Sequence, residues 1–316
     1  DVERSRGLGD VYKRQLLIPS VIGMKATRIN YDILAYLPDN VDTVQGENIL
    51  TNEFNMGSYS IVITENMSTK HIQKLEDKFK QLDNVEKVVS VADLLGSNVP
   101  VEMLPDNIKD IAYKDGDTAI LVTFKEGISS DKTLESIEQL RKIADKQCKI
   151  SGMSALVLDT KDIANSEIVT YVVIAVVLCM IVLQFALDSY LAPVFLLASI
   201  GIAILYNMGS NIFLGEISYI TKAISAVLQL GVTMDFAIFL YHSYQAELKN
   251  TTDRNQAMSI AISKTFTSVL GSSLTTIAGF LALCSMNLTL GKDIGIVMAK
   301  GVLFGVISVV TILPSL

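Results

Sequence analysis

Hydrophobic and polar residues follow two different patterns along this chain, and the change comes near residue 167. Residues 25–166 alternate short apolar runs with polar stretches, whereas residues 167–316 hold long runs without charge. About 20 mostly apolar residues are needed to cross the roughly 30 Å hydrocarbon core of a bilayer. The pattern therefore predicts a domain outside the membrane, 25–166, followed by a transmembrane part, 167–316.

Several stretches of the second part are long and apolar enough to be membrane spans. They are 168–187, 191–214, 223–241, 265–290 and 294–316. The apolar stretch 16–24 is interpreted as the end of a truncated first transmembrane helix. Residues 1–15 are charged and resemble sequencing-adapter read-through, so we expect them to be non-native and exclude them from the fold argument.

The domain outside the membrane switches between strand and helix periodicity in a regular order. Apolar or alternating runs predict strands, and apolar residues spaced three or four apart predict helices. The order is strand-helix-strand, strand-helix-strand, with strands expected at 58–64, 85–91, 118–124 and 148–153. This order is typical of the split βαβ, ferredoxin-like (βαββαβ) arrangement, in which both helices cover one face of a four-stranded sheet. The predicted fold class is thus an α-helical polytopic membrane protein with an α+β domain.

Composition agrees with a membrane protein and argues against several other classes. Half of the side chains (50%) are hydrophobic, only 19% are charged, and the mean hydropathy is +0.42. A net charge of −7 argues against a nucleic-acid partner, which requires a basic surface. Basic residues slightly favour a cytoplasmic loop at 242–264. That orientation places 25–166 outside the cytoplasm, in a protein of the cell (cytoplasmic) membrane.

The sequence contains no pattern that predicts an enzyme. It lacks the GxxxxGK[ST] phosphate-binding loop, and it has no Ser/His/Asp or Cys/His arrangement. Three cysteines and two histidines stand far apart, without the spacing of a zinc site. We therefore expect no cofactor and no metal, and an ion gradient as the energy source for any uphill transport.

Asp235 is the residue most indicative of function. A carboxylate at the centre of a span costs about 2.5–3.5 kcal/mol on insertion scales, and such residues usually line proton or ion paths. We expect Asp235 to relay protons; the alternative is a structural carboxylate that is hydrogen-bonded to a neighbouring helix. Gly231 and His242 lie on the same helical face. His242 either relays protons or is simply solvated at the interface.

Lys300 and a row of hydroxyl residues could support Asp235. Lys300 lies about 9 Å below the outer end of its span and Asp235 about 18 Å below that of its own, so we expect Lys300 to extend toward the interface instead of pairing. Ser272 and Thr276 belong to a row of small and hydroxyl residues along 265–290. Such a row either allows close helix packing or lines a polar path.

These segments together resemble the MMPL group of the RND (resistance-nodulation-division) transporter superfamily, over nearly all of the chain after residue 15. The stretch GVTMDFAIFLYHSY (231–244) is similar to the family's fourth-span motif, a Gly and then an Asp followed by an aromatic residue. Similarity to the fifth span, the inner end of the sixth and the opening of the porter domain is carried by SVLGSSLTTIAGFLAL (268–283), TILPSL (311–316) and YLPDNVDT (36–43).

The resemblance implies a transporter driven by the proton-motive force that exports lipids or other hydrophobic compounds, with Asp235 as proton carrier and 25–166 as porter domain. It implies twelve spans, so the missing C-terminal half of the same protein is an expected partner. The other expected partners are the bilayer, the hydrophobic or lipid substrate and further copies of the chain in a homo-oligomer. Phe236 departs from the family, because relatives commonly carry Tyr there and a hydroxyl is lost. The alternative function is a non-transporting membrane sensor or assembly platform of the same architecture.

Overall fold

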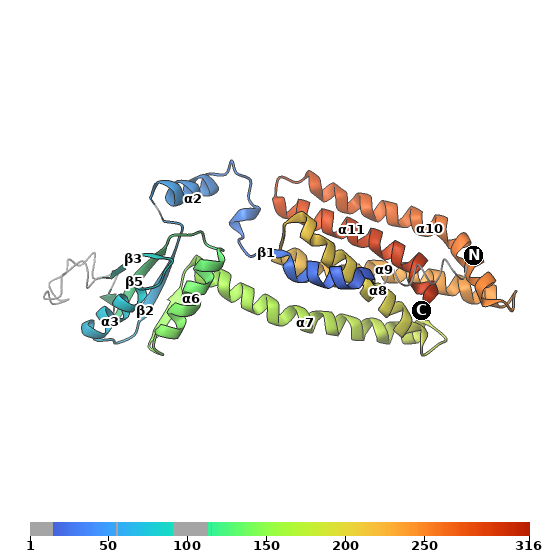
Figure 1. The fold of residues 1–316 in the computed structure, drawn as a ribbon, viewed down its shortest axis with the longest axis horizontal. Helices are drawn as coiled ribbons and strands as arrows, with labels where there is room; N and C mark the ends of the chain where they lie inside the picture. The colour runs from blue at the N-terminus through green and yellow to red at the C-terminus, as the bar shows by residue number, and fades with distance from the viewer. Residues whose placement is uncertain (1–14, 55, 91–112, 115) are drawn as a thin grey trace. The chain divides into compact units, whose positions relative to one another are not determined.

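A computed structural model describes residues 15–54, 56–90, 113–114 and 116–316 of the chain (Figure 1). Residues 1–14, nearly all of the stretch expected to be non-native, lie outside the described residues. The chain divides into two compact units. We call residues 31–163 the α/β unit, and the described residues up to Asn30 together with Ala164–Leu316 the helical unit.

The α/β unit has the expected order β-α-β, β-α-β, preceded by two helical elements. Its elements are η1 (Leu34–Tyr36), α2 (Asp42–Glu53), β2 (Ser58–Thr64), α3 (Thr69–Phe79), β3 (Val85–Ser90), β4 (Tyr113–Lys114), β5 (Asp117–Phe124), α6 (Asp131–Ile143) and β6 (Cys148–Ser151). The strand order is β3-β5-β2-β6, with antiparallel neighbours throughout, and the short β4 adds to β5. The first strand of each βαβ half, β2 and β5, therefore lies in the middle of the sheet.

The core of the α/β unit lies between the two helices and one face of the sheet. Val62, Ile120 and Val122 alternate with exposed neighbours along β2 and β5 and are fully buried. The helices α3 and α6 contact each other and bury their apolar stripes, which are Ile72, Leu75 and Phe79 in α3 and Leu134, Ile137 and Leu140 in α6. Side chains alternate between the two faces of a strand and repeat every 3.6 residues along a helix. The apolar residues of the strands and of the helices therefore face the same core.

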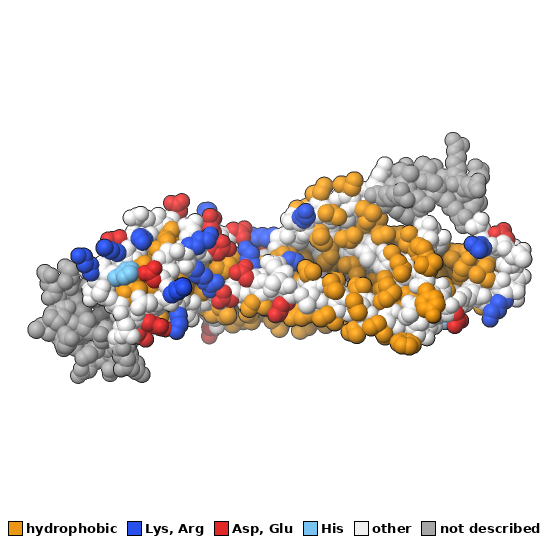
Figure 2. All heavy atoms as spheres, turned by 90° about the horizontal axis from the view of Figure 1, so that it is seen from below, with side chains coloured by type: hydrophobic (Ala, Val, Ile, Leu, Met, Phe, Trp, Pro, Cys, Tyr) orange, Lys and Arg blue, Asp and Glu red, His pale blue; other side chains and the backbone are white. Residues whose placement is uncertain are grey.

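The helical unit begins with a helix at 15–26, followed by β1 (Arg28–Asn30). Its other elements are α7 (Met153–Ala186), which starts in the α/β unit, α8 (Ala192–Gly209), η3 (Ser210–Leu214), β7 (Glu216–Ser218), α9 (Tyr219–Leu248), α10 (Arg254–Ala282), η4 (Leu283–Ser285), α11 (Thr289–Thr311) and η5 (Leu313–Ser315). Among the described residues, five helices are long and apolar enough to cross a membrane. Figure 2 shows hydrophobic side chains over most of this unit, whereas charged side chains gather over the α/β unit.

The helices extend beyond the predicted spans, into both ends of the loop expected at 242–264. The helix α9 continues to Leu248 and α10 begins at Arg254, so only 249–253 connect them. Polar side chains in these added turns are compatible with a helix, but an apolar-run criterion detects only the part that lies in hydrocarbon. Asp253 caps α10, because its carboxylate accepts a hydrogen bond from the backbone N–H of Asn255 at 2.9 Å.

Close packing in the helical unit depends on small residues of α11. This helix contacts α8, α9 and α10. A Cβ atom at Gly301 would lie 2.6 Å from Nδ2 of Asn207, and one at Gly305 would lie 2.0 Å from Cγ2 of Thr233. The two glycines, four positions apart, therefore let α11 approach α8 and α9 more closely than any side chain would permit.

Candidate functional site

Asp235 lies near the middle of α9, roughly 24 Å along the axis from the first residue of the helix. Its side chain is exposed on the surface of the helical unit, where it lines a groove of about 590 Å³ between α9 and α10. The groove is lined by Val232, Asp235, Phe236, Phe239, Ser268, Val269, Ser272 and Thr276. Among the described residues, no hydrogen bond or ion pair engages the Asp235 carboxylate.

The hydroxyl residues of α10 share this groove with Asp235. The Ser272 hydroxyl donates to the carbonyl of Val269 at 3.2 Å, and the Thr276 hydroxyl donates to the carbonyl of Ser272 at 3.0 Å. A hydroxyl that donates to its own helix still has lone pairs with which to accept a hydrogen bond. Ser272 and Thr276 can therefore accept a hydrogen bond from a water molecule or a protonated carboxylate in the groove.

The other residues expected near Asp235 divide between the groove face and the core. Gly231 and His242 are exposed on the face of α9 that carries Asp235. A Cβ atom at Gly231 would meet nothing within 4 Å, so packing among the described residues does not explain this glycine. Phe236 is 7% exposed and packs in the helical core while also lining the groove.

A different face of α9 carries a buried polar row that sequence reasoning missed. Thr221, Ser225, Gln229 and Thr233 recur every four positions and are completely buried. Gln229 Oε1 accepts from Nδ2 of Asn207 at 2.8 Å, and its Nε2 donates to the carbonyl of Gly301 at 2.9 Å. The four-residue spacing of these polar residues was the available signal, but it was overlooked because they carry no charge.

Lys300 belongs to this buried side of the bundle and not to the groove. Its Nζ donates to the backbone carbonyl of Asn207 at 3.1 Å and to Oδ1 of Asn211 at 2.5 Å. The stem of Lys300 thus extends to the end of the bundle where α8 ends and α9 begins. The structure does not bring Lys300 together with Asp235.

Asp293 is a second charged residue that sequence reasoning missed. Its Oδ2 accepts hydrogen bonds from the backbone N–H of Ser218 and from the Thr221 hydroxyl, both at 2.6 Å. The predicted apolar span begins at residue 294, which leaves Asp293 in the preceding loop. In the structure it lies in the second turn of α11 and is half-buried.

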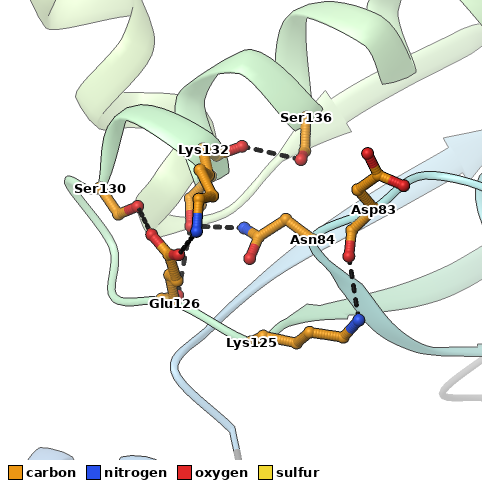
Figure 3. A network of polar contacts seen from close by, with 8 residues as sticks. Asp83, Asn84, Lys125, Glu126, Ser130, Lys132 and Ser136 are labelled. Carbon is orange, nitrogen blue, oxygen red and sulfur yellow. Dashed lines mark hydrogen bonds and ion pairs between the residues drawn. The ribbon is translucent and has the colours of Figure 1, made fainter.

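The α/β unit holds a polar network at the start of α6, shown in Figure 3. Glu126 accepts hydrogen bonds from Lys132, at 2.5 Å, and from Ser130. These two donors, Lys132 foremost, lower the pKa of the Glu126 carboxyl below its ordinary value. Nearby, Nζ of Lys125 donates to the carbonyl of Asp83 at 2.9 Å. The network fixes the turn between β5 and α6.

A metal centre does not emerge from the part of the chain that the structure describes. No group of three or more His, Cys, Asp or Glu side chains gathers there in a way that could hold an ion. The three cysteines are each free thiols, at Cys148, Cys179 and Cys284. The groove with Asp235 is therefore the strongest candidate site among the described residues.

Comparison with known proteins identifies the family of the chain. The MMPL family model matches residues 35–316. The membrane protein ActII-3 of Streptomyces coelicolor is 35% identical over 114 residues, which cover 36% of this chain and 16% of that protein. The membrane protein MJ1562 of Methanocaldococcus jannaschii is 23% identical over 274 residues, covering 78% of this chain and 69% of that protein.

MmpL4 of Mycobacterium leprae, whose name describes it as a probable transport protein, is 24% identical over 193 residues, which cover 57% of this chain and 20% of that protein. A solved structure of SecDF in its super-membrane-facing form covers 98% of this chain and 37% of its own, at 13% identity and a TM-score of 0.49. The chain thus matches only 16% of ActII-3 and 20% of MmpL4. Since the family model covers most of the chain, this membrane protein belongs to the MMPL family.

Proposed function

We propose that this chain is part of a proton-driven exporter of lipids or other hydrophobic compounds, in which Asp235 carries the proton. The observation that carries the proposal is the position of Asp235, mid-helix in a candidate span and in a groove with the hydroxyls of α10. A carboxylate at such a depth is usually functional. The printed description of MmpL4 as a probable transport protein supports the same conclusion.

In the proposed cycle, Asp235 takes up a proton from one side of the membrane and releases it to the other. Protonation removes the charge and with it the cost of holding the carboxylate away from water, so the two protonation states favour different packing of the face that carries it. Ser272 and Thr276 accept hydrogen bonds along the path. The proton gradient supplies the energy, and no cofactor takes part.

The α/β unit acts as a ferredoxin-like porter domain on the outer side of the cytoplasmic membrane in this proposal. Its hydrophobic or lipid substrate passes from the bilayer through that domain. The open face of α9 and α10, with Gly231 beside Asp235, is the surface on which the C-terminal half of a twelve-span protein packs. Small residues on that face support the proposal, because they allow a further helix to approach closely.

The test is efflux of a lipophilic fluorescent probe from cells that produce the full-length protein, with and without an uncoupler of the proton gradient. Asp235→Asn should abolish uncoupler-sensitive efflux, whereas Asp235→Glu should retain a large part of it. Asp188→Asn removes an exposed carboxylate outside the groove and is the matched control. Normal efflux by a correctly folded Asp235→Asn variant would refute the relay. A wild-type protein that moves neither protons nor probe would favour the sensor or assembly platform.

A further inference from the structure

Asp293 of α11 compensates the N-terminal end of α9. Ser218 is the N-cap of that helix, and its hydroxyl accepts from the backbone N–H of Ile220 at 3.1 Å. The Asp293 carboxylate accepts hydrogen bonds from the backbone N–H of Ser218 and from the Thr221 hydroxyl. A helix N-terminus carries a partial positive charge and unpaired N–H groups. The carboxylate therefore satisfies both the charge and the donors at this end.

Lys300 of α11 compensates the C-terminal end of α8 in the same manner. This helix ends at Gly209, and the carbonyl of Asn207 is among its last. A helix C-terminus carries a partial negative charge and unpaired carbonyls. The ammonium of Lys300 donates to this carbonyl and to Asn211 in the following turn. Asn207 is completely buried, and its carbonyl accepts from both the Ser210 hydroxyl, at 2.9 Å, and Lys300, so loss of Lys300 would leave it with one of two donors.

The two charges therefore match two helix ends of opposite sign. Asp293 and Lys300 lie seven positions, about two turns, apart on α11. Each reaches an end of the hairpin that α8 and α9 form, where the connecting residues 210–218 reverse the chain. Unpaired backbone groups and isolated charges are both costly in a membrane. Combining each charge with a helix end offsets both costs.

The Asp293 contact also reaches the strand that leads to the α/β unit. Ser218 is the last residue of β7, and β7 pairs in parallel with β1, Ser218 opposite Asn30. The side chain of Asn30 donates to Oε1 of Glu216 at 3.3 Å. Asp293 thus binds the backbone of β7, the strand that pairs with β1.

We propose that Asp293 and Lys300 form a two-point clamp on α11 that holds the α8–α9 hairpin and ties strand β1 to the helix that carries Asp235. The clamp is a property of the helical unit, and it stands whether or not Asp235 carries protons. The competing explanation is that the two charges merely neutralise each other along α11.

A double-mutant cycle on the full chain, purified in detergent, separates the two explanations through the melting temperature. In a clamp each charge acts on its own helix end, so Asp293→Asn and Lys300→Met should each lower the melting temperature by about 3 °C or more, and the shifts should add in the double variant. Lys292→Gln, an exposed neighbour on α11, should cause no shift. A double variant that recovers toward wild type would show mutual neutralisation and overturn the clamp, as would single variants without effect.

Cysteine crosslinking tests the tie to β1 separately. Arg28 and Glu216 are paired across the two strands and exposed, so Arg28→Cys and Glu216→Cys are introduced after the three native cysteines are replaced by serine. Asp293→Asn should lower the disulfide yield after brief oxidation at least about twofold, and Lys300→Met should leave it unchanged. An unchanged yield in Asp293→Asn would refute the tie. If a neutral variant does not accumulate in membranes, Asp293→Glu and Lys300→Arg, which keep the charge, replace it. Their melting temperature and disulfide yield are then measured in the same way.

Discussion

Gly305 of α11 faces Thr233 of α9 so closely that a Cβ atom at position 305 would lie 2.0 Å from the Thr233 methyl carbon. No pair of carbon atoms that are not bonded to each other can be that close. The contact lies one turn from Gly301, where a Cβ atom would lie 2.6 Å from Nδ2 of Asn207 and 3.0 Å from Oε1 of Gln229. The separation of α9 and α11 is therefore fixed by the absence of a side chain at these positions.

Gly305→Val should destabilise the protein by about 1–3 kcal/mol, because the added side chain overpacks the α9–α11 contact. Thermal unfolding of the purified chain measures the change. Gly201→Val is the matched control, since a Cβ atom at this position of α8 meets nothing within 4 Å, and its effect on stability should stay within about 0.5 kcal/mol. Equal effects of the two substitutions would contradict the packing role.

Gln229→Met should destabilise the protein by about 1–3 kcal/mol, since it leaves Nδ2 of Asn207 and the carbonyl of Gly301 buried without their partner. Gln245→Met, at a half-buried position near the C-terminal end of the same helix, serves as the control and should change little. Thermal unfolding is again the measurement. A stable Gln229→Met variant would mean that other groups satisfy these two atoms.

Ser272→Ala and Thr276→Val should each lower probe efflux about three- to tenfold if their hydroxyls accept hydrogen bonds along a proton path. Thr275→Val removes a neighbouring hydroxyl that does not line the groove and should leave efflux unchanged. The rate of efflux, normalised to the amount of protein in the membrane, is the quantity to compare. Loss of efflux in all three variants alike would indicate a packing role for the hydroxyl row.

The start of α6 should lose protection at acidic pH because of Glu126. Its pKa is lowered in the folded state, so its stabilising effect is complete above the ordinary carboxyl pKa of about 4.3 and is lost as the pH falls through the lowered value. Amide hydrogen exchange near Ser130 and Lys132, followed between pH 6 and 3, should show this loss. Glu126→Gln should remove the pH dependence, whereas Glu135→Gln, on the exposed side of α6, should retain it.

The apolar runs and the two periodicities were sufficient to predict most elements of both units. The strands at 58–64 and 85–91 and the two helices of the α/β unit follow directly from residue spacing, because their apolar faces all turn to one core. Helix ends were harder to place. The polar turns at 242–248 and 254–264 remain helical, but hydropathy contains no information on helices outside the hydrocarbon.

Side chains that act across helices could be predicted only in part. The spacing of Ser272 and Thr276 predicted that they share one helix face, and in the structure both line the groove with Asp235. The contacts of Asp293 and Lys300 depend on which helices adjoin α11, and a single sequence does not encode that adjacency in any local pattern. Depth along the helix excluded a pair between Lys300 and Asp235, but it could not identify Asn207 and Asn211 as the partners of Lys300.

The short connection at 249–253 bears on how the protein enters the bilayer. As a solitary segment, α9 would present a bare carboxylate to lipid during synthesis, which makes its insertion unfavourable. Since α10 follows after so few residues, the two helices can leave the insertion machinery as one hairpin, with hydroxyl groups already beside Asp235. The brevity of this turn thus couples the arrival of Asp235 to that of the hydroxyl groups that share its groove.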